Sequence, residues 1–214
     1  MVVGLGAGST AAFAVRALAQ RHQQVVDIPT SERRAQLAAA AGIPLASFAQ
    51  HLVIDMTLDG AGQVGPGTLH LIKGRGGALL REKTIATASR GLPIAVDETK
   101  QAKRLGVRMP VPAEVVMCGM EATRTTLETL GAMTRLRLDH SGTSPFTNGA
   151  NWIGACSSGP IAAAAHLEER IKRVVGVVDC SIFIDVADLV FVAAAAAVRP
   201  LGRMTAAPGV PSDQ

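Results

Sequence analysis

The chain of 214 residues is poor in aromatic side chains: Phe, Trp and Tyr together make up 3% of it, and Tyr is absent. Aromatic rings are the surfaces on which proteins stack nucleic-acid bases, and here the basic residues are spread along the chain rather than clustered. The net charge of +4 therefore permits small anionic ligands, while nucleic acid is not expected as a partner.

Cysteine is also scarce, since only Cys118, Cys156 and Cys180 occur, far apart and odd in number. This pattern excludes a disulfide framework and a zinc-ligand spacing, and the five histidines are scattered as well. We therefore interpret the cysteines as reduced structural thiols and expect no metal site.

Long apolar runs are missing too. A membrane-spanning helix needs roughly 20 apolar residues, and no stretch is both that long and free of charge. The first strand-like run starts without a basic leader. We expect a cytoplasmic protein without a membrane partner or a signal peptide.

Apolar runs alternate with helical patterns over the first hundred residues, which favours an α/β fold with a mostly parallel, Rossmann-like sheet flanked by helices. In the helical pattern 29–42, Ser31 is a candidate N-cap, Glu32 lies in the first turn and Gly42 is a stop signal. The runs predict strands at 1–5, 25–28, 52–56, 69–72 and 92–96, and helices at 9–22, 29–42 and 77–90.

The pattern changes after residue 110. Short strands and helices within 111–182 predict a small α+β subdomain with the character of a lid. The apolar run 189–193 predicts a return to the main sheet, so the main domain is expected to comprise 1–110 and 183–198. The segment 199–214 is rich in Pro and Gly and is interpreted as a loose tail.

The turn from Gly6 to Ala11 allows three interpretations. It matches G-x-G-x-x-A between a strand and a helix, and Asp27 follows about 20 residues later, as in dinucleotide-binding proteins. A helix N-terminus with the hydroxyls of Ser9 and Thr10 also suits a phosphate group. The third interpretation is purely structural, a tight turn with Ser9 as the helix cap.

Asp59, Lys73 and Glu82 form the second candidate group. Asp59 follows a strand, Lys73 opens a glycine loop, and Glu82 lies in the next predicted helix. A carboxylate that moves a proton and an ammonium that stabilises an enediolate oxygen are what proton transfer next to a carbonyl requires. For Glu82 alone, a solvated pair with a neighbouring cation on the helix surface is the competing interpretation.

From Met1 to about Asp188 the chain resembles ribose-5-phosphate isomerase type A, an enzyme of the cytosolic pentose phosphate pathway. The resemblance rests on motifs in the family's order: VGLGAGSTAAF, IPTSERRAQLA, LDGAG, LIKGRGGALLREK, VDETK, VPAEVV, GPIA and FIDVAD. It implies an α/β domain with a small α+β domain, a sugar-phosphate substrate, a dimer or tetramer, and neither a metal nor an organic cofactor.

The resemblance also implies residue roles. Glu82 is the base that shuttles a proton between C1 and C2, Lys73 stabilises the enediolate, and Asp59 helps to open the sugar ring. The remaining substrate contacts fall in four segments: the turn 7–10, which would hold the phosphate; the DGA segment 59–61 with Gly62; the loop 73–76 that begins at Lys73 (the lysine loop); and the DETK segment 97–100. They are Ala7, Gly8, Ser9, Thr10, Gly60, Ala61, Gly62, Gly74, Arg75, Gly76 and Lys100.

The chain departs from the family pattern at several places, among them TNGAN (147–151) in place of TDNGN and AAAAAV in place of a C-terminal G-x-x-D-G turn. Gly62 stands where the family has the second aspartate of D-G-A-D-E, Arg75 replaces a glycine of the lysine loop, and the helix that precedes the first strand is absent. Without that helix, part of the sheet is expected to be uncovered. These departures favour an alternative, a catalytically weakened sugar-phosphate-binding paralogue. A nucleotide-dependent oxidoreductase is a third hypothesis, resting on the opening turn and Asp27 alone.

Overall fold

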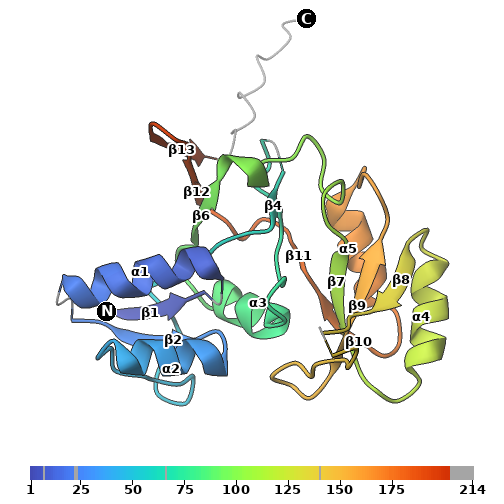
Figure 1. The fold of residues 1–214 in the computed structure, drawn as a ribbon, viewed down its shortest axis with the longest axis horizontal. Coiled ribbons are helices and arrows are strands. Elements are labelled where there is room, and N and C mark those ends of the chain that lie inside the picture. Colours follow the sequence, from blue (N-terminus) through green and yellow to red (C-terminus); the bar gives the residue numbers. More distant parts are fainter. Residues whose placement is uncertain (7, 22–23, 66, 140, 203–214) are drawn as a thin grey trace, which may run out of the picture.

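The computed structural model describes residues 1–6, 8–21, 24–65, 67–139 and 141–202 (Figure 1). In these residues strands and helices alternate up to β3, three strands (β3, β4 and β5) then follow in succession, and most of the later elements are strands. The elements are β1 (Val2–Leu5), α1 (Ser9–Gln20), β2 (Val26–Pro29), α2 (Glu32–Ala40), β3 (Met56–Leu58), β4 (Gln63–Val64), β5 (Leu71–Ile72), α3 (Leu79–Thr87), β6 (Pro93–Asp97), the 3-10 helix η1 (Glu98–Lys100), β7 (Val111–Val115), α4 (Met120–Glu128), β8 (Met133–Leu136), β9 (Trp152–Ser157), α5 (Ala164–Lys172), β10 (Val177–Cys180), β11 (Ile182–Phe183), β12 (Leu189–Ala193) and β13 (Val198–Gly202).

The N-terminal unit has the parallel arrangement expected from the sequence. Strand β1 lies between β2 and β3 and pairs with both in parallel. The predicted limits of α2 are confirmed: the Ser31 side chain accepts a hydrogen bond from the Arg34 N–H, and Gly42 follows the helix with a φ of +74°. Helix α1 begins at Ser9 with Gly8 at the N-cap, so Ser9 is not the cap.

The expectation of one mostly parallel sheet is wrong. The described strands form four small sheets, in which β6–β12 and the β1 pairs are parallel, whereas β12–β13, β4–β5–β11 and the β7–β10 sheet are antiparallel. Many connections after β3 are too short for a parallel crossover, which needs a dozen residues or more. The strand expected at 52–56 is reduced to β3, since Ile54 makes only an isolated bridge to Ser89.

Residues 111–182 contain an antiparallel sheet in the order β10-β7-β9-β8, with α4 and α5 packed against it. Its buried core includes Val111, Leu127 and Ile171. Figure 1 shows this sheet on one side of the molecule, the β1–β3 unit with α1 and α2 on the other, and α3 between them.

The C-terminal part of the described chain returns to β6. Strand β12 pairs with β6 in parallel, and β13 forms an antiparallel hairpin with β12. Residues 199–202 therefore belong to a strand, contrary to the expected loose tail from Arg199, and the rest of that segment lies outside the described residues. Among the described helices, none has the length and apolar character needed to cross a bilayer.

Candidate active site

A buried lysine lies between two buried carboxylates at the centre of the molecule. The Lys73 Nζ atom is 2.7 Å from Asp59 Oδ2 and 3.3 Å from Glu82 Oε2, and at most 5% of each side chain is exposed. Lys73 Nζ also donates a hydrogen bond to the Gly60 carbonyl oxygen at 2.6 Å. The structure thus brings together the three residues predicted to be catalytic, and the solvated surface pair considered for Glu82 is wrong.

Strand ends position Asp59. It follows β3, its N–H donates to the Pro93 carbonyl, and its own carbonyl accepts from the Ala95 N–H at 2.8 Å. Gly6, at the end of β1, lies so close that a Cβ there would stand 1.9 Å from Asp59 Oδ1. The carboxylate therefore requires glycine at position 6. Carboxyl ends of neighbouring parallel strands are where α/β proteins place their ligands.

Lys73 and Glu82 are joined by a turn of glycines. The Lys73 N–H donates to the Ser181 carbonyl at 3.0 Å, which continues the pairing of β5 with β11. Gly74 and Gly77 have φ values of +73° and +85°, so this loop depends on glycine at both positions. Helix α3 starts directly after the loop and carries Glu82 in its first turn.

Arg75 does not strain this loop, because it does not adopt a positive φ. Its side chain is exposed and its carbonyl accepts a hydrogen bond from the Arg137 guanidinium, which also donates to the Gly74 carbonyl at 3.4 Å. An arginine in place of glycine at position 75 therefore causes no backbone strain.

Burial and neighbouring charges shift the pKa values of Glu82 and Lys73. Burial raises the pKa of Glu82 above its usual range, against the opposing effect of the Lys73 ammonium. For Lys73, burial acts to lower the pKa, but the carboxylates of Asp59 and Glu82 outweigh it and the pKa is raised. A carboxyl with a raised pKa beside a permanent cation suits a group that accepts and returns a proton.

These residues line a cavity of about 330 Å³. Arg33 on α2 also lines it, which the sequence analysis missed; its only signal was a basic pair in the first turn of a helix near the phosphate turn. A neighbouring cavity of about 530 Å³ shares Arg33 and Gly76. The predicted residues that line the smaller cavity are Gly8, Thr10, Asp59, Gly60, Ala61, Gly62, Lys73, Gly74, Arg75, Gly76, Glu82 and Lys100.

The side chains of two predicted phosphate contacts, Ala7 and Ser9, lie outside the described part of the structure. Ala7 lies outside the described residues, and Ser9 is described only through its backbone as the first residue of α1. Lys100, at the end of η1, forms an ion pair with Asp97 at 3.7 Å on the rim of the cavity.

The position of the missing motif aspartate is filled from another segment. A Cβ on Gly62 would stand 2.4 Å from Met109 Sδ and 3.2 Å from the Ile72 carbonyl oxygen. The next residue, Gln63, is fully buried and accepts a hydrogen bond from the Gly106 N–H at 2.8 Å. Both positions thus serve packing between β4 and the segment 105–109.

Asp27 does not face a ligand. Its side chain is fully buried and Oδ1 accepts the Leu5 N–H at 3.1 Å. Burial raises the pKa of Asp27 to about 7, although the Leu5 N–H and the Arg34 charge oppose this shift. A carboxyl that is fully buried cannot bind a ribose hydroxyl. The dinucleotide interpretation, which relied on Asp27 for this contact, is therefore not supported.

A family profile described as ribose 5-phosphate isomerase A (phosphoriboisomerase A) matches residues 26–197. The chain belongs to the ribose 5-phosphate isomerase A family. It is 51% identical over 196 residues to ribose-5-phosphate isomerase A of Gloeobacter violaceus, covering 90% of this chain and 85% of that protein. The Synechococcus ribose-5-phosphate isomerase A is 45% identical over 205 residues, covering 94% and 89%.

Solved ribose 5-phosphate isomerases share the fold. A D-ribose-5-phosphate isomerase in complex with phospho-erythronic acid superposes with a TM-score of 0.91 at 35% identity, covering 95% of this chain and 91% of that one. Ribose 5-phosphate isomerase A of Methanocaldococcus jannaschii has a TM-score of 0.90 at 35% identity, covering 94% and 91%.

Proposed function

We propose that Asp59, Lys73 and Glu82 carry out the ribose-5-phosphate isomerase reaction of this family, which belongs to the pentose phosphate pathway. The observation that carries the proposal is the buried Lys73 ammonium, 2.7 Å from one carboxylate and 3.3 Å from the other. One acid–base group and one fixed cation are sufficient for an aldose–ketose exchange, because the reaction moves protons only.

The proton steps follow from this arrangement. In the open-chain aldose, the Glu82 carboxylate removes the proton from C2, the electron pair forms a C1–C2 double bond, and negative charge develops on the C1 oxygen. Lys73 stabilises that charge with an ammonium group that is held in place by Asp59 and the Gly60 carbonyl. Glu82 then returns the proton to C1, and transfer of the hydroxyl proton from the C2 oxygen to the C1 oxygen completes the ketose. Asp59, beside Lys73, assists the opening of the sugar ring.

The start of α1 and three basic residues of the cavity lining suit the phosphate group. Gly8 and Thr10 lie at the start of α1, where helix N–H groups attract anions, and Arg33, Arg75 and Lys100 line the same cavity. In this proposal Ala7 and Ser9 complete the turn, as the family resemblance implies. The complex of a related isomerase with phospho-erythronic acid supports a phosphorylated sugar derivative as the occupant.

The domain limits and the assembly belong to the same proposal. Residues 1–110 with 183–198 form the main domain, and 111–182 form a small lid-like domain whose Arg137 contacts the lysine loop. A homodimer or homotetramer is the expected assembly, which size-exclusion chromatography with light scattering would test.

One observation favours a second candidate, an isomerase of reduced rate that binds its substrate normally. Gly62 removes a carboxylate from the cavity, and Met109 occupies the space beside it. The cavity keeps all the basic residues named above, so phosphate binding does not depend on this position.

Turnover of ribose 5-phosphate separates these alternatives. The ketose is followed by its carbonyl absorbance, with Glu82→Gln as the matched variant because it keeps the shape and loses the base. We expect turnover in the parent chain and a loss of roughly 10²- to 10⁴-fold in kcat for Glu82→Gln. Unchanged turnover in the variant would exclude Glu82 as the base. Weak parent turnover with normal sugar-phosphate binding would establish the second candidate.

A further inference from the structure

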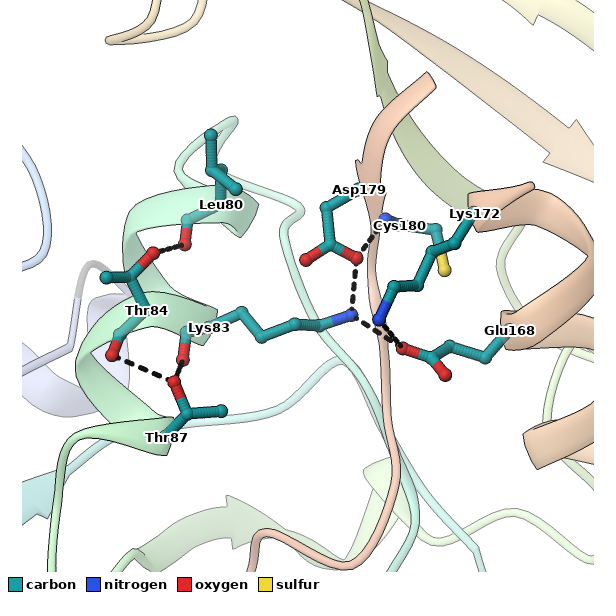
Figure 2. Close-up of polar contacts among 8 residues, drawn as sticks. All are labelled: Leu80, Lys83, Thr84, Thr87, Glu168, Lys172, Asp179 and Cys180. Atoms are coloured by element: carbon teal, nitrogen blue, oxygen red, sulfur yellow. Dashed lines mark hydrogen bonds and ion pairs between the residues drawn. The ribbon is translucent and has the colours of Figure 1, made fainter. Parts of the chain in front are cut away.

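Lys83 follows the proposed base on α3 and points to the other side of the helix. Consecutive helical side chains are about 100° apart, so Lys83 leaves the active site while Glu82 enters it. Its Nζ atom lies 2.8 Å from Asp179 Oδ1 and 3.2 Å from Glu168 Oε1 (Figure 2). Asp179 belongs to β10 and Glu168 to α5, so one lysine joins α3 to two elements of the segment 111–182.

The segment that follows Asp179 contacts both Lys73 and the side chain of Lys83 on α3. Ser181 accepts the backbone hydrogen bond of Lys73 at 3.0 Å. The Phe183 ring is buried, and the Lys73 and Lys83 ammonium groups lie over it at 5.5 and 5.2 Å from its centroid. The segment 179–183 therefore holds Lys73 through its backbone and α3 through Lys83.

We infer that Lys83 is a positioning residue for the isomerase reaction: its ion pairs with Asp179 and Glu168 fix the rotation of α3 and thereby the distance from the Glu82 carboxylate to Lys73 and the substrate carbon. The inference rests on the proposed role of Glu82. Lys83 does not line the cavity, so its effect on the reaction passes through α3 and through the Phe183 ring, which also lies below the Lys73 ammonium.

The size of the effect follows from helix geometry. A side chain reaches about 5–6 Å from the helix axis, so a rotation of about 10° moves its end by about 1 Å. A displacement of 1 Å can reduce the rate of a reaction by about 10²-fold. Helix α3 has only nine residues and starts after a glycine loop, so the lysine tether in its middle is a strong restraint on its orientation.

A metal site is the competing interpretation of this cluster. Among the described residues, Glu168, Asp179 and Cys180 place potential ligand atoms within 4.8 Å of one another. The Lys83 and Lys172 ammonium groups already neutralise these carboxylates, Lys172 lying 3.2 Å from Glu168 Oε1. Burial raises the pKa of the Cys180 thiol to about 12, so the thiol is neutral beside these ion pairs at neutral pH. The cluster is therefore an ion-pair network.

The test compares Lys83→Met, Lys83→Arg and Lys172→Met in the full chain, each assayed with ribose 5-phosphate well below its melting temperature. Lys172→Met is the matched control, because it removes a lysine from Glu168 without touching α3. We expect kcat of Lys83→Met to fall roughly 10- to 100-fold with KM within about 2-fold of the parent value. Lys83→Arg should recover most of the loss, and Lys172→Met should keep kcat within about 2-fold.

A variant that merely loses stability has normal kcat once it is folded, so unchanged kcat in folded Lys83→Met overturns the inference. A change confined to KM, or an equal loss of kcat in Lys172→Met, also overturns it. If Lys83→Met does not fold, the double variant Lys83→Met and Asp179→Asn also removes the part-buried Asp179 carboxylate that faces Lys83, while Glu168 keeps its ion pair with Lys172. The same loss of kcat is expected there, and parent-like kcat overturns the inference.

Glu82→Gln is assayed in parallel to separate the two proposals. If Glu82→Gln is inactive and Lys83→Met has parent kcat, only the positioning role fails. If Glu82→Gln retains parent kcat, the base assignment fails, and the positioning role fails with it.

Discussion

The Met109 sulfur occupies the space into which a side chain at Gly62 would extend: a Cβ there would stand 2.4 Å from Sδ and 3.1 Å from Cε. The glycine that replaces the motif carboxylate and the methionine 47 positions later therefore pack against each other, and each limits which side chain fits at the other position. The Ile72 carbonyl oxygen, 3.2 Å from the same point, adds a backbone neighbour that cannot move aside as a methionine can.

This arrangement predicts that Gly62→Asp alone does not restore a family-like site. The aspartate must displace Met109, and overpacking of this kind costs about 1–3 kcal/mol of stability. We expect a lower melting temperature and no gain in kcat, whereas Gly62→Asp with Met109→Ala should recover part of the stability. Gly60→Ala is the control, because its Cβ would have only ordinary contacts, the nearest at 3.5 Å. A single Gly62→Asp variant with parent stability and higher kcat would contradict the prediction.

Gly6→Ala is expected to inactivate the enzyme through Asp59. The new methyl group would stand 1.9 Å from Oδ1 and 2.1 Å from Cγ, so the buried carboxylate must leave its place beside Lys73. We expect kcat to fall by about 10²-fold or more, with a melting temperature lowered by overpacking. Gly8→Ala is the control for stability, since no atom lies within 4 Å of its Cβ position and its φ is −70°. A Gly6→Ala variant with the melting temperature of Gly8→Ala and the kcat of the parent chain would refute the argument.

The raised pKa of Glu82 predicts the acid side of the pH–rate profile. The base must be ionised to accept a proton, so kcat/KM should fall as the pH drops through a pKa above the ordinary value of 4.5. Lys73 lowers that pKa, so Lys73→Met should move the acid limb of its residual activity to higher pH. Lys100→Met, on the cavity rim, should raise KM and leave the limb in place. An acid limb that stays at the same pH in Lys73→Met would argue against Glu82 as the titrating base.

Helix ends and glycine turns could be predicted from the sequence, because they depend on interactions between residues that are close in the chain. Ser31 caps α2 because its hydroxyl reaches the N–H three residues later, and Gly42 ends the helix because the chain there needs a positive φ. Both depend on neighbouring residues only. The catalytic residues could likewise be named from motifs, because the order of strand, glycine loop and helix is contained in one short segment.

The partners and directions of the strands could not be predicted in this way, because they depend on residues that are far apart in the chain. Lys73 is held by Ser181, more than one hundred residues away, and an apolar dipeptide such as β5 carries no signal of its partner or direction. The mixed sheets were therefore missed. Arg33 and Met109 were missed for the same reason, since Arg33 reaches the cavity and Met109 reaches Gly62 through tertiary packing that no local pattern encodes.

Asp27 provides a stability test at neutral pH. Burial raises its pKa from 3.8 to about 7, so between these values the folded state holds a proton that the unfolded state has lost. The stabilisation is complete below the unfolded pKa and disappears as the pH rises through about 7, a loss of about 2 kcal/mol between pH 5.5 and 8.5. Asp27→Asn cannot titrate, so its free energy of unfolding in urea should lack this decline, while Glu121→Gln, at an exposed position of α4, is the control and should keep the parent slope. Parallel pH dependence in the parent and Asp27→Asn would show that Asp27 does not titrate in this range.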